Sequence, residues 1–183
     1  NIGAGVNAAL NNSVLVSNAN LIVNGAVTVG DSSGGTATGN QLTIGGASSA
    51  TLQQLIVSNN NTVALLGGTL SVSSKTVISN GQDFVIGDGV QAAVFKTLTG
   101  AHLFQNSVIV SNGGAYIGSG TAPSTTIGAS ASGYSNSLTV TGSGSIWSNG
   151  PGNADLTVGN AGSSYNSLRI ADGGRMVIVT SGG

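Results

Sequence analysis

The chain has 183 residues, with four Lys or Arg, five Asp or Glu and a formal net charge of −1, so it offers no basic surface that could hold nucleic acid or an anionic membrane. It has no cysteine, which excludes disulfides and thiolate metal sites, and no apolar run approaches the roughly 20 residues of a membrane-inserted helix. The hydrophobic 39% of the residues falls in short ordered runs, which predicts a folded all-β protein.

A first pattern recurs along the chain: Asn, then Ser or Gln, then an apolar, a variable and an apolar residue. It occupies residues 12–16, 40–44, 106–110, 136–140 and 166–170, and the last three copies begin 30 residues apart. Alternation with a period of two is typical of a strand with one buried face.

A second pattern, in which an apolar-x-apolar run ends at Gly, lies between copies of the first. It occupies residues 27–30, 84–87, 116–118 and 156–159. The gaps are rich in Gly, Ser, Ala and Asn, which suit corners that need positive φ. Strands and corners that alternate at a nearly fixed period predict a parallel β-helix, or β-solenoid, in which stacked turns bury the apolar rows that one turn cannot bury alone. Right-handedness is the expected hand of such a fold, and Asn and Ser at the corners are expected to form side-chain ladders.

We expect one domain over 1–183, with regular repeats at 1–44 and 106–183 and an irregular middle at 45–105. Within that middle, residues 90–105 resemble an insertion, which is either a plain internal loop or a recognition loop on an otherwise smooth surface. The side chains that would carry recognition are Phe95, Lys96, His102 and Phe104.

The polar chemistry predicts no catalytic centre. The five acidic residues are all Asp and are scattered, whereas a catalytic pair of carboxylates needs two acids that converge across a cleft. Asp31 and Asp88 each follow a strand-ending Gly, which favours turn residues. The alternative is that Asp31-Ser32 or Asp88-Gly89 contributes to a calcium site, and we expect no other cofactor. His102 is interpreted as a loop residue.

Two further sets of side chains leave alternatives open. Thr28, Thr43, Thr139 and Thr157 each lie between apolar residues, so they are expected to face solvent, as an ordinary hydrated surface or as an ice-binding row. The two large aromatic residues Tyr116 and Trp147 are expected in the core, with stacking on sugar as the alternative.

The segments NSLTVTGSGSIWSNG, ADLTVGNAGSSYNSLRI and ADGGRMVIV resemble repeats of large secreted bacterial surface proteins, of the kind found in autotransporter passenger regions. The resemblance covers residues 106–183 and, less closely, 1–44. It implies an extracellular or cell-surface β-solenoid that works as an adhesin, a stalk or a fibre.

The two ends of the chain both lie inside the repeat pattern. Joined tail to head they would read SGGNIG, close to SNGGAYIG at 111–118, so we expect copies to stack head to tail into an open filament. The expected contact residues are Ile2, Val6, Leu10, Met176, Val177, Ile178 and Val179. The predicted function is that of a structural subunit of a bacterial surface fibre. The alternatives are a fragment of a longer repeat protein and a passenger segment of an adhesin that binds a surface glycan.

Overall fold

The computed structural model describes residues 1–3, 9–31, 36–79, 83–88, 90–120, 124–129, 135–150, 155–160 and 162–179. These residues form β-strands and no helix, and all the strand pairs between them are parallel. The prediction of an all-β protein is confirmed, and the pairing is parallel. In the same residues we find no helix with the length and apolar character needed to cross a membrane.

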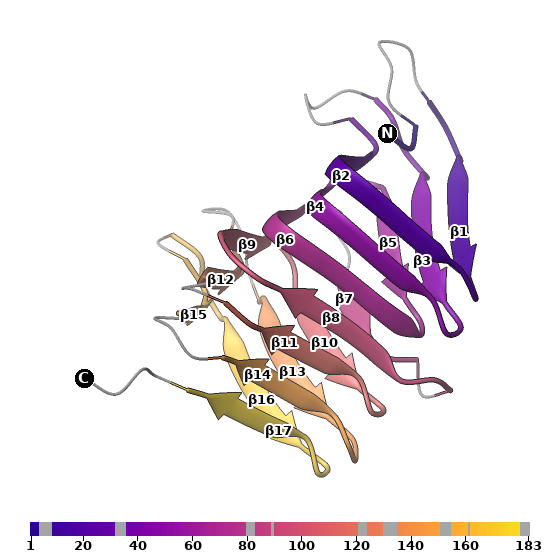
Figure 1. The fold of residues 1–183 in the computed structure, drawn as a ribbon. Coiled ribbons are helices and arrows are strands. Elements are labelled where there is room, and N and C mark those ends of the chain that lie inside the picture. The colour runs from indigo at the N-terminus through magenta and orange to yellow at the C-terminus, as the bar shows by residue number, and fades with distance from the viewer. Residues whose placement is uncertain are drawn as a thin grey trace.

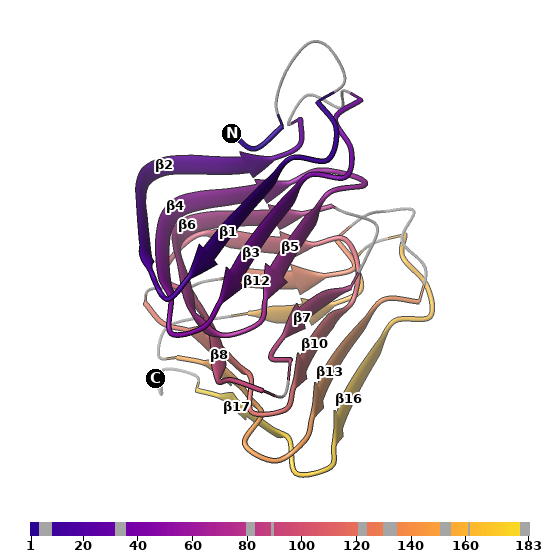
Figure 2. The same ribbon diagram turned by 90° about the vertical axis from the view of Figure 1, so that its right-hand side faces the viewer.

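Seven strands form one sheet, which we call the first row and which Figure 2 shows strand by strand. In sheet order they are β1 (Ser13–Ser17), β3 (Gln41–Gly45), β5 (Thr62–Leu65), β7 (Phe84–Ile86), β10 (Val108–Ser111), β13 (Ser137–Thr141) and β16 (Ser167–Ala171). Five of them, β1, β3, β10, β13 and β16, are the five copies of the Asn-led pattern. That pattern therefore identified strands that belong to one sheet.

The other sheet has ten strands and contains two rows. Three long strands, β2 (Asn20–Val29), β4 (Ser49–Val57) and β6 (Gly68–Ile78), bend and span both rows (Figure 1). The second row holds their first halves and then β8 (Ala93–Thr97), β11 (Ala115–Gly118), β14 (Ile146–Asn149) and β17 (Arg175–Ile178). The third row holds their second halves and then β9 (Ala101–Phe104), β12 (Ser124–Ile127) and β15 (Leu156–Val158).

The rows separate where the long strands end. One side of β6 pairs with β4 along both halves, whereas its other side pairs first with β8 and then with β9. Register shifts at the bends of β2 and β4 mark the same division. The chain thus visits the first, second and third rows in turn.

The second sequence pattern does not correspond to one row. Its four copies lie in three rows: 27–30 and 156–159 belong to the third row, 116–118 to the second and 84–87 to the first. Alternation with a period of two reports which side chains face inward, and it is the same in every row. It therefore could not assign a strand to a row.

The middle of the chain, predicted to be irregular at 45–105, has strands in all three rows but a shorter spacing between them than the rest. Partners in neighbouring first-row strands are 28, 21, 21, 24, 30 and 30 residues apart from β1 to β16. Fewer residues therefore separate neighbouring first-row strands in the middle of the chain than at either end, and the strands stay in the same rows. Residues 90–105, expected to be a loop, supply β8 and β9.

Corner residues with positive φ explain the Asn, Gly and Asp that follow first-row strands. Six such corners have φ of 50° at Asn18, 64° at Gly46, 96° at Gly87, 51° at Asn112, 87° at Gly142 and 51° at Asp172. Gly adopts this left-handed region without steric cost, and Asn and Asp tolerate it better than other residues. The corner type therefore selects these three residue types.

The core consists of ladders in which each inward side chain lies on its counterpart in the next strand. In the second row the successive partners are Leu21, Ala50, Leu70, Phe95, Tyr116, Trp147 and Met176. The Tyr116 and Trp147 rings stack with centroids 3.6 Å apart and planes 3° apart, and both side chains are fully buried. Their expected core placement is confirmed, and neither ring is exposed to stack on sugar.

The four threonines expected to face solvent do not behave alike. Thr157 is exposed and Thr43 and Thr139 are half-buried, but Thr28 is only 7% exposed. The prediction is therefore wrong for Thr28. Thr28 lies in the third row, whereas Thr43 and Thr139 lie in the first, so the four do not form one continuous row.

Trp147 offers a test of the ladder core. We expect Trp147→Ala to lower the free energy of unfolding by about 3–5 kcal/mol, since it leaves a large cavity under Tyr116. Among the described residues the Trp147 indole Nε1 has no hydrogen-bond partner. Trp147→Phe therefore breaks no hydrogen bond and should cost less than about 2 kcal/mol. Urea denaturation followed by circular dichroism measures both variants, and equal losses would contradict this account of the core.

Candidate functional site

The most distinctive surface of the described chain is its C-terminal sheet edge, formed by β16 and β17. Leu168 and Ile170 occupy inward positions of the first row, yet they are 49% and 48% exposed. Their partners in β13, Leu138 and Val140, are fully buried. The difference arises because no described strand pairs with the outer side of β16.

The opposite edge, at β1, has the same character. Val14 is 38% exposed, whereas its partner Leu42 in β3 is fully buried. The N-terminal and C-terminal strands lie at opposite ends of the molecule (Figure 1). The described chain therefore has two open edges made from equivalent positions of the same rows.

Asparagines at the start of the first-row strands form hydrogen-bonded ladders, as predicted for the corners. The Asn12 backbone N–H donates to Asn40 Oδ1 at 3.0 Å, and the Asn40 N–H donates to Asn61 Oδ1 at 3.0 Å. The Asn136 N–H donates to Asn166 Oδ1 at 3.3 Å in the same way. Each side chain thus satisfies a backbone donor of the preceding strand, at a corner where regular strand pairing has not yet begun.

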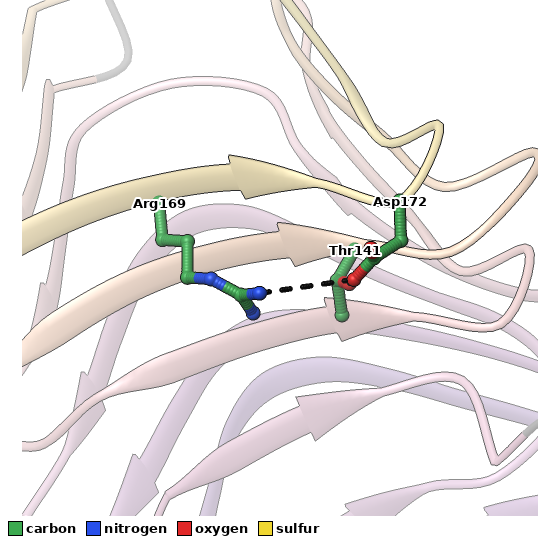
Figure 3. A network of polar contacts seen from close by, with 3 residues as sticks. All are labelled: Thr141, Arg169 and Asp172. Carbon is green, nitrogen blue, oxygen red and sulfur yellow. Dashed lines mark hydrogen bonds and ion pairs between the residues drawn. The ribbon is translucent and has the colours of Figure 1, made fainter.

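The C-terminal edge also carries three charged side chains, of which two form an ion pair. Arg169 Nη2 lies 3.8 Å from Asp172 Oδ2, and the Thr141 hydroxyl donates to the same Oδ2 at 2.9 Å (Figure 3). Both charged side chains are more than 60% exposed, so the ion pair contributes little to stability. The Thr141 hydrogen bond holds the Asp172 carboxylate against the neighbouring strand β13.

The predicted contact residues at the two ends are only partly strand residues. Ile2 forms an isolated parallel bridge with Val29, and Leu10 forms one with Thr38. Met176, Val177 and Ile178 lie in β17, and Val179 follows it. Met176 and Ile178 continue inward ladders, whereas Val177 is the partner of the half-buried Ser148. Val6 lies outside the described residues.

The predicted recognition loop is wrong, because three of its four side chains belong to the core. Phe95, His102 and Phe104 are at most 1% exposed and lie in β8 and β9. Phe95 and Phe104 pack around Phe84, with ring centroids 5.3 and 5.7 Å from it. Only Lys96, between two inward residues of β8, is exposed.

His102 belongs to a polar row inside the third row of strands, which the sequence analysis missed. Its ladder partners are Thr76 and Thr125, both buried. Nδ1 lies 3.0 Å from Thr76 Oγ1, and Nε2 lies 3.1 Å from the Thr99 carbonyl oxygen. Alternation could have signalled this placement, since His102 and Phe104 are two residues apart and share a face of β9.

A tyrosine hydroxyl extends the buried polar group. Tyr116 Oη lies 2.7 Å from Thr125 Oγ1 and 3.2 Å from Thr97 Oγ1. Burial raises the pKa of Tyr116 to about 12, and the two hydroxyl contacts oppose this effect. Tyr116 therefore stays neutral over the physiological range, and the threonines satisfy a polar atom that would otherwise be costly to bury.

The aspartates behave as turn residues where they are described. Asp88 Oδ1 accepts hydrogen bonds from the backbone N–H groups of Val90 and Gln91 at 2.8 and 3.3 Å, which confirms its predicted turn role. The Asp31 N–H donates to Ser58 Oγ at 3.0 Å. Ser32 and Gly89, the neighbours considered for calcium, lie outside the described residues. Within the described part, His, Cys, Asp and Glu side chains do not gather in groups of three or more.

Comparison with known proteins found no matching family model, curated protein or solved structure. The function is therefore inferred from the geometry of the chain itself.

The buried His102 predicts a specific pH dependence of stability. Desolvation lowers the pKa of His102 from 6.5 to about 4 in the folded state. The unfolded chain therefore binds more protons between these two values, so stability falls as the pH drops from about 6.5 towards 4. The loss attributable to His102 should approach about 3 kcal/mol.

Urea midpoints measured between pH 7.5 and 4 test this prediction, with His102→Gln as the control that does not titrate. The aspartates contribute equally to both proteins, so the difference between the two profiles isolates His102. Parallel profiles would contradict a buried neutral histidine.

Proposed function

We propose that the three rows form a right-handed parallel β-helix. The support is that strands of each row pair in parallel and in register from one end of the chain to the other, while the chain passes through the rows in a constant order. Repeats of 21–30 residues between first-row partners suit one such turn.

We further propose that the chain is a structural subunit of an extracellular bacterial fibre, in which copies add head to tail. The observation that carries this proposal is the pair of open edges. Leu168 and Ile170 at one edge and Val14 at the other are exposed at inward ladder positions, whereas their partners inside the molecule are fully buried. Val16, the other inward residue of β1, is buried. Adding a turn of the same pattern would bury the exposed side chains. Complete burial of a Leu or Ile side chain stabilises the assembly by about 1.5–3 kcal/mol.

The edges lack several features by which proteins usually block edge-to-edge pairing. Such edges are commonly protected by prolines, inward charges or a covering element. Neither β1 nor β16 contains proline, and the single charge on them, Arg169, is the partner of the half-buried Thr139 on the outward face. The two edges differ in position along the rows, so their contact is heterologous and generates an open filament.

The glycan-binding alternative has less support. The aromatic residues considered for it, Phe95, Phe104, Tyr116 and Trp147, are all in the core. Among the described aromatic residues only Tyr165 is exposed. An enzyme is not favoured either, because no three acidic or histidine side chains gather among the described residues and His102 is fully buried.

Electron microscopy tests the fibre proposal. We expect the purified 183-residue chain, diluted from denaturant at tens of micromolar, to form uniform unbranched filaments. The double substitution Leu168→Asp/Ile170→Asp should abolish them, because it places charges on the inward positions of the C-terminal edge. Sedimentation velocity should show a folded monomer instead.

The control is Val85→Asp, which introduces a single Asp on the outward face of β7, where Val85 is 40% exposed. This variant should still form filaments. Short monodisperse particles from the unchanged chain, or filaments from the double variant, would contradict the proposal.

A further inference from the structure

We propose that the joint between two copies has one fixed register, in which β16 pairs in parallel with β1 of a second copy and places Ser167 opposite its Ser13. This inference rests on the proposed fibre function and adds which residues meet. It follows from the register inside the chain, where Ser13 pairs with Gln41 and Ser137 with Ser167. Continuing the first row by one strand then pairs Leu168 with Val14 and Ile170 with Val16 of the second copy.

The asparagine ladder selects this register. At three steps of the first row, the first Asn donates its backbone N–H to Oδ1 of the next Asn, and the residue after that next Asn donates back to the first carbonyl. The second kind of bond runs from Gln41 to Asn12 at 2.8 Å, from Thr62 to Asn40 at 2.9 Å and from Ser167 to Asn136 at 3.0 Å.

At the joint, the same two bonds would link Asn166 to the second copy. The Asn166 N–H would donate to Oδ1 of Asn12, and the N–H of Ser13 would donate to the Asn166 carbonyl. No described residue accepts from the Asn166 N–H or donates to Asn12 Oδ1. A shift by one residue would lose both bonds and turn every inward side chain outward.

The other two rows agree with this register. In the second row the inward ladder ends at Met176 and begins at Leu21, so these residues meet. In the third row the ladder begins at Ile2, which bridges to Val29, and ends at Val158. A single translation along the rows therefore brings all three rows into register. It places Ile2 of the second copy beside β15, its β1 beside β16, and the first half of its β2 beside β17.

Charge does not oppose the joint. Residues 1–30 contain no charged side chain, so Arg169, Asp172 and Arg175 on the C-terminal edge meet only neutral side chains. Symmetric pairing of two β16 edges, or of two β1 edges, would run antiparallel and could not continue the Asn ladder. The occupant of the C-terminal edge is therefore the N-terminal edge of a second copy.

Cysteine crosslinking tests the register, because the chain has no native cysteine and Ser13, Ser17 and Ser167 are all exposed. Single variants Ser13→Cys and Ser167→Cys are mixed in denaturant, diluted to assemble and oxidised. Directly opposed residues in neighbouring strands lie about 4.8 Å apart, within disulfide range. The off-register control mixes Ser17→Cys with Ser167→Cys, which the joint would hold roughly 13 Å apart.

We expect at least tenfold more disulfide-linked dimer from the Ser13→Cys mixture than from the Ser17→Cys mixture on non-reducing gels. Filaments that crosslink equally in both mixtures, or only in the control, would overturn the register while leaving the fibre proposal in place. Dimers from Ser13→Cys alone would show symmetric edge pairing and overturn it too. Failure of every mixture to assemble, seen by microscopy before oxidation, would overturn both proposals.

Discussion

Parallel, in-register stacking is the constraint on which the rest of this structure depends. Each inward side chain must fit the side chains directly above and below it, because neighbouring strands lie only about 4.8 Å apart. The second-row ladder shows the effect, since Phe95, Tyr116 and Trp147 follow one another and the last two stack face to face. The core is packed along the rows, and each strand depends on its two neighbours for burial.

The corners obey the same rule through hydrogen bonds. The asparagines at the start of the first row are stacked so that each satisfies a backbone donor of its neighbour, and positive φ at the end of those strands selects Asn, Gly or Asp. In the third row, His102 and its Thr neighbours extend the principle to the core, where polar side chains are tolerated because they lie beside one another.

The sequence predicted those features that depend on a single chemical requirement. The Asn-led pattern identified five of the seven first-row strands, because the ladder needs Asn at one position of the turn. The strand at 84–87 lacks that Asn, and so it was grouped with strands of other rows. β5 has Asn61 at the ladder position, and the pattern missed this strand because Thr62 follows Asn61 where the other copies have Ser or Gln.

Placement of the predicted sites could not be read from the sequence for a related reason. Phe95, His102 and Phe104 lie in the stretch 90–105, which was interpreted as an insertion in the repeat. The register shows instead that Phe95 follows Leu70 and His102 follows Thr76 in ladders of the core. Residues stacked in the first row are 21 to 30 positions apart in the sequence. The 30-residue spacing is easier to recognise in the sequence than the 21-residue spacing.

The central claim is that open edges of the rows are completed by a second copy. Hydrogen–deuterium exchange of monomer and assembled forms, read peptide by peptide, tests it most directly. The account predicts that amides of β1, β16 and β17 exchange rapidly in the monomer and become protected on assembly, while β4 and β6 are protected in both forms. Unchanged exchange at β1, β16 and β17 would contradict it, and so would new protection confined to central strands.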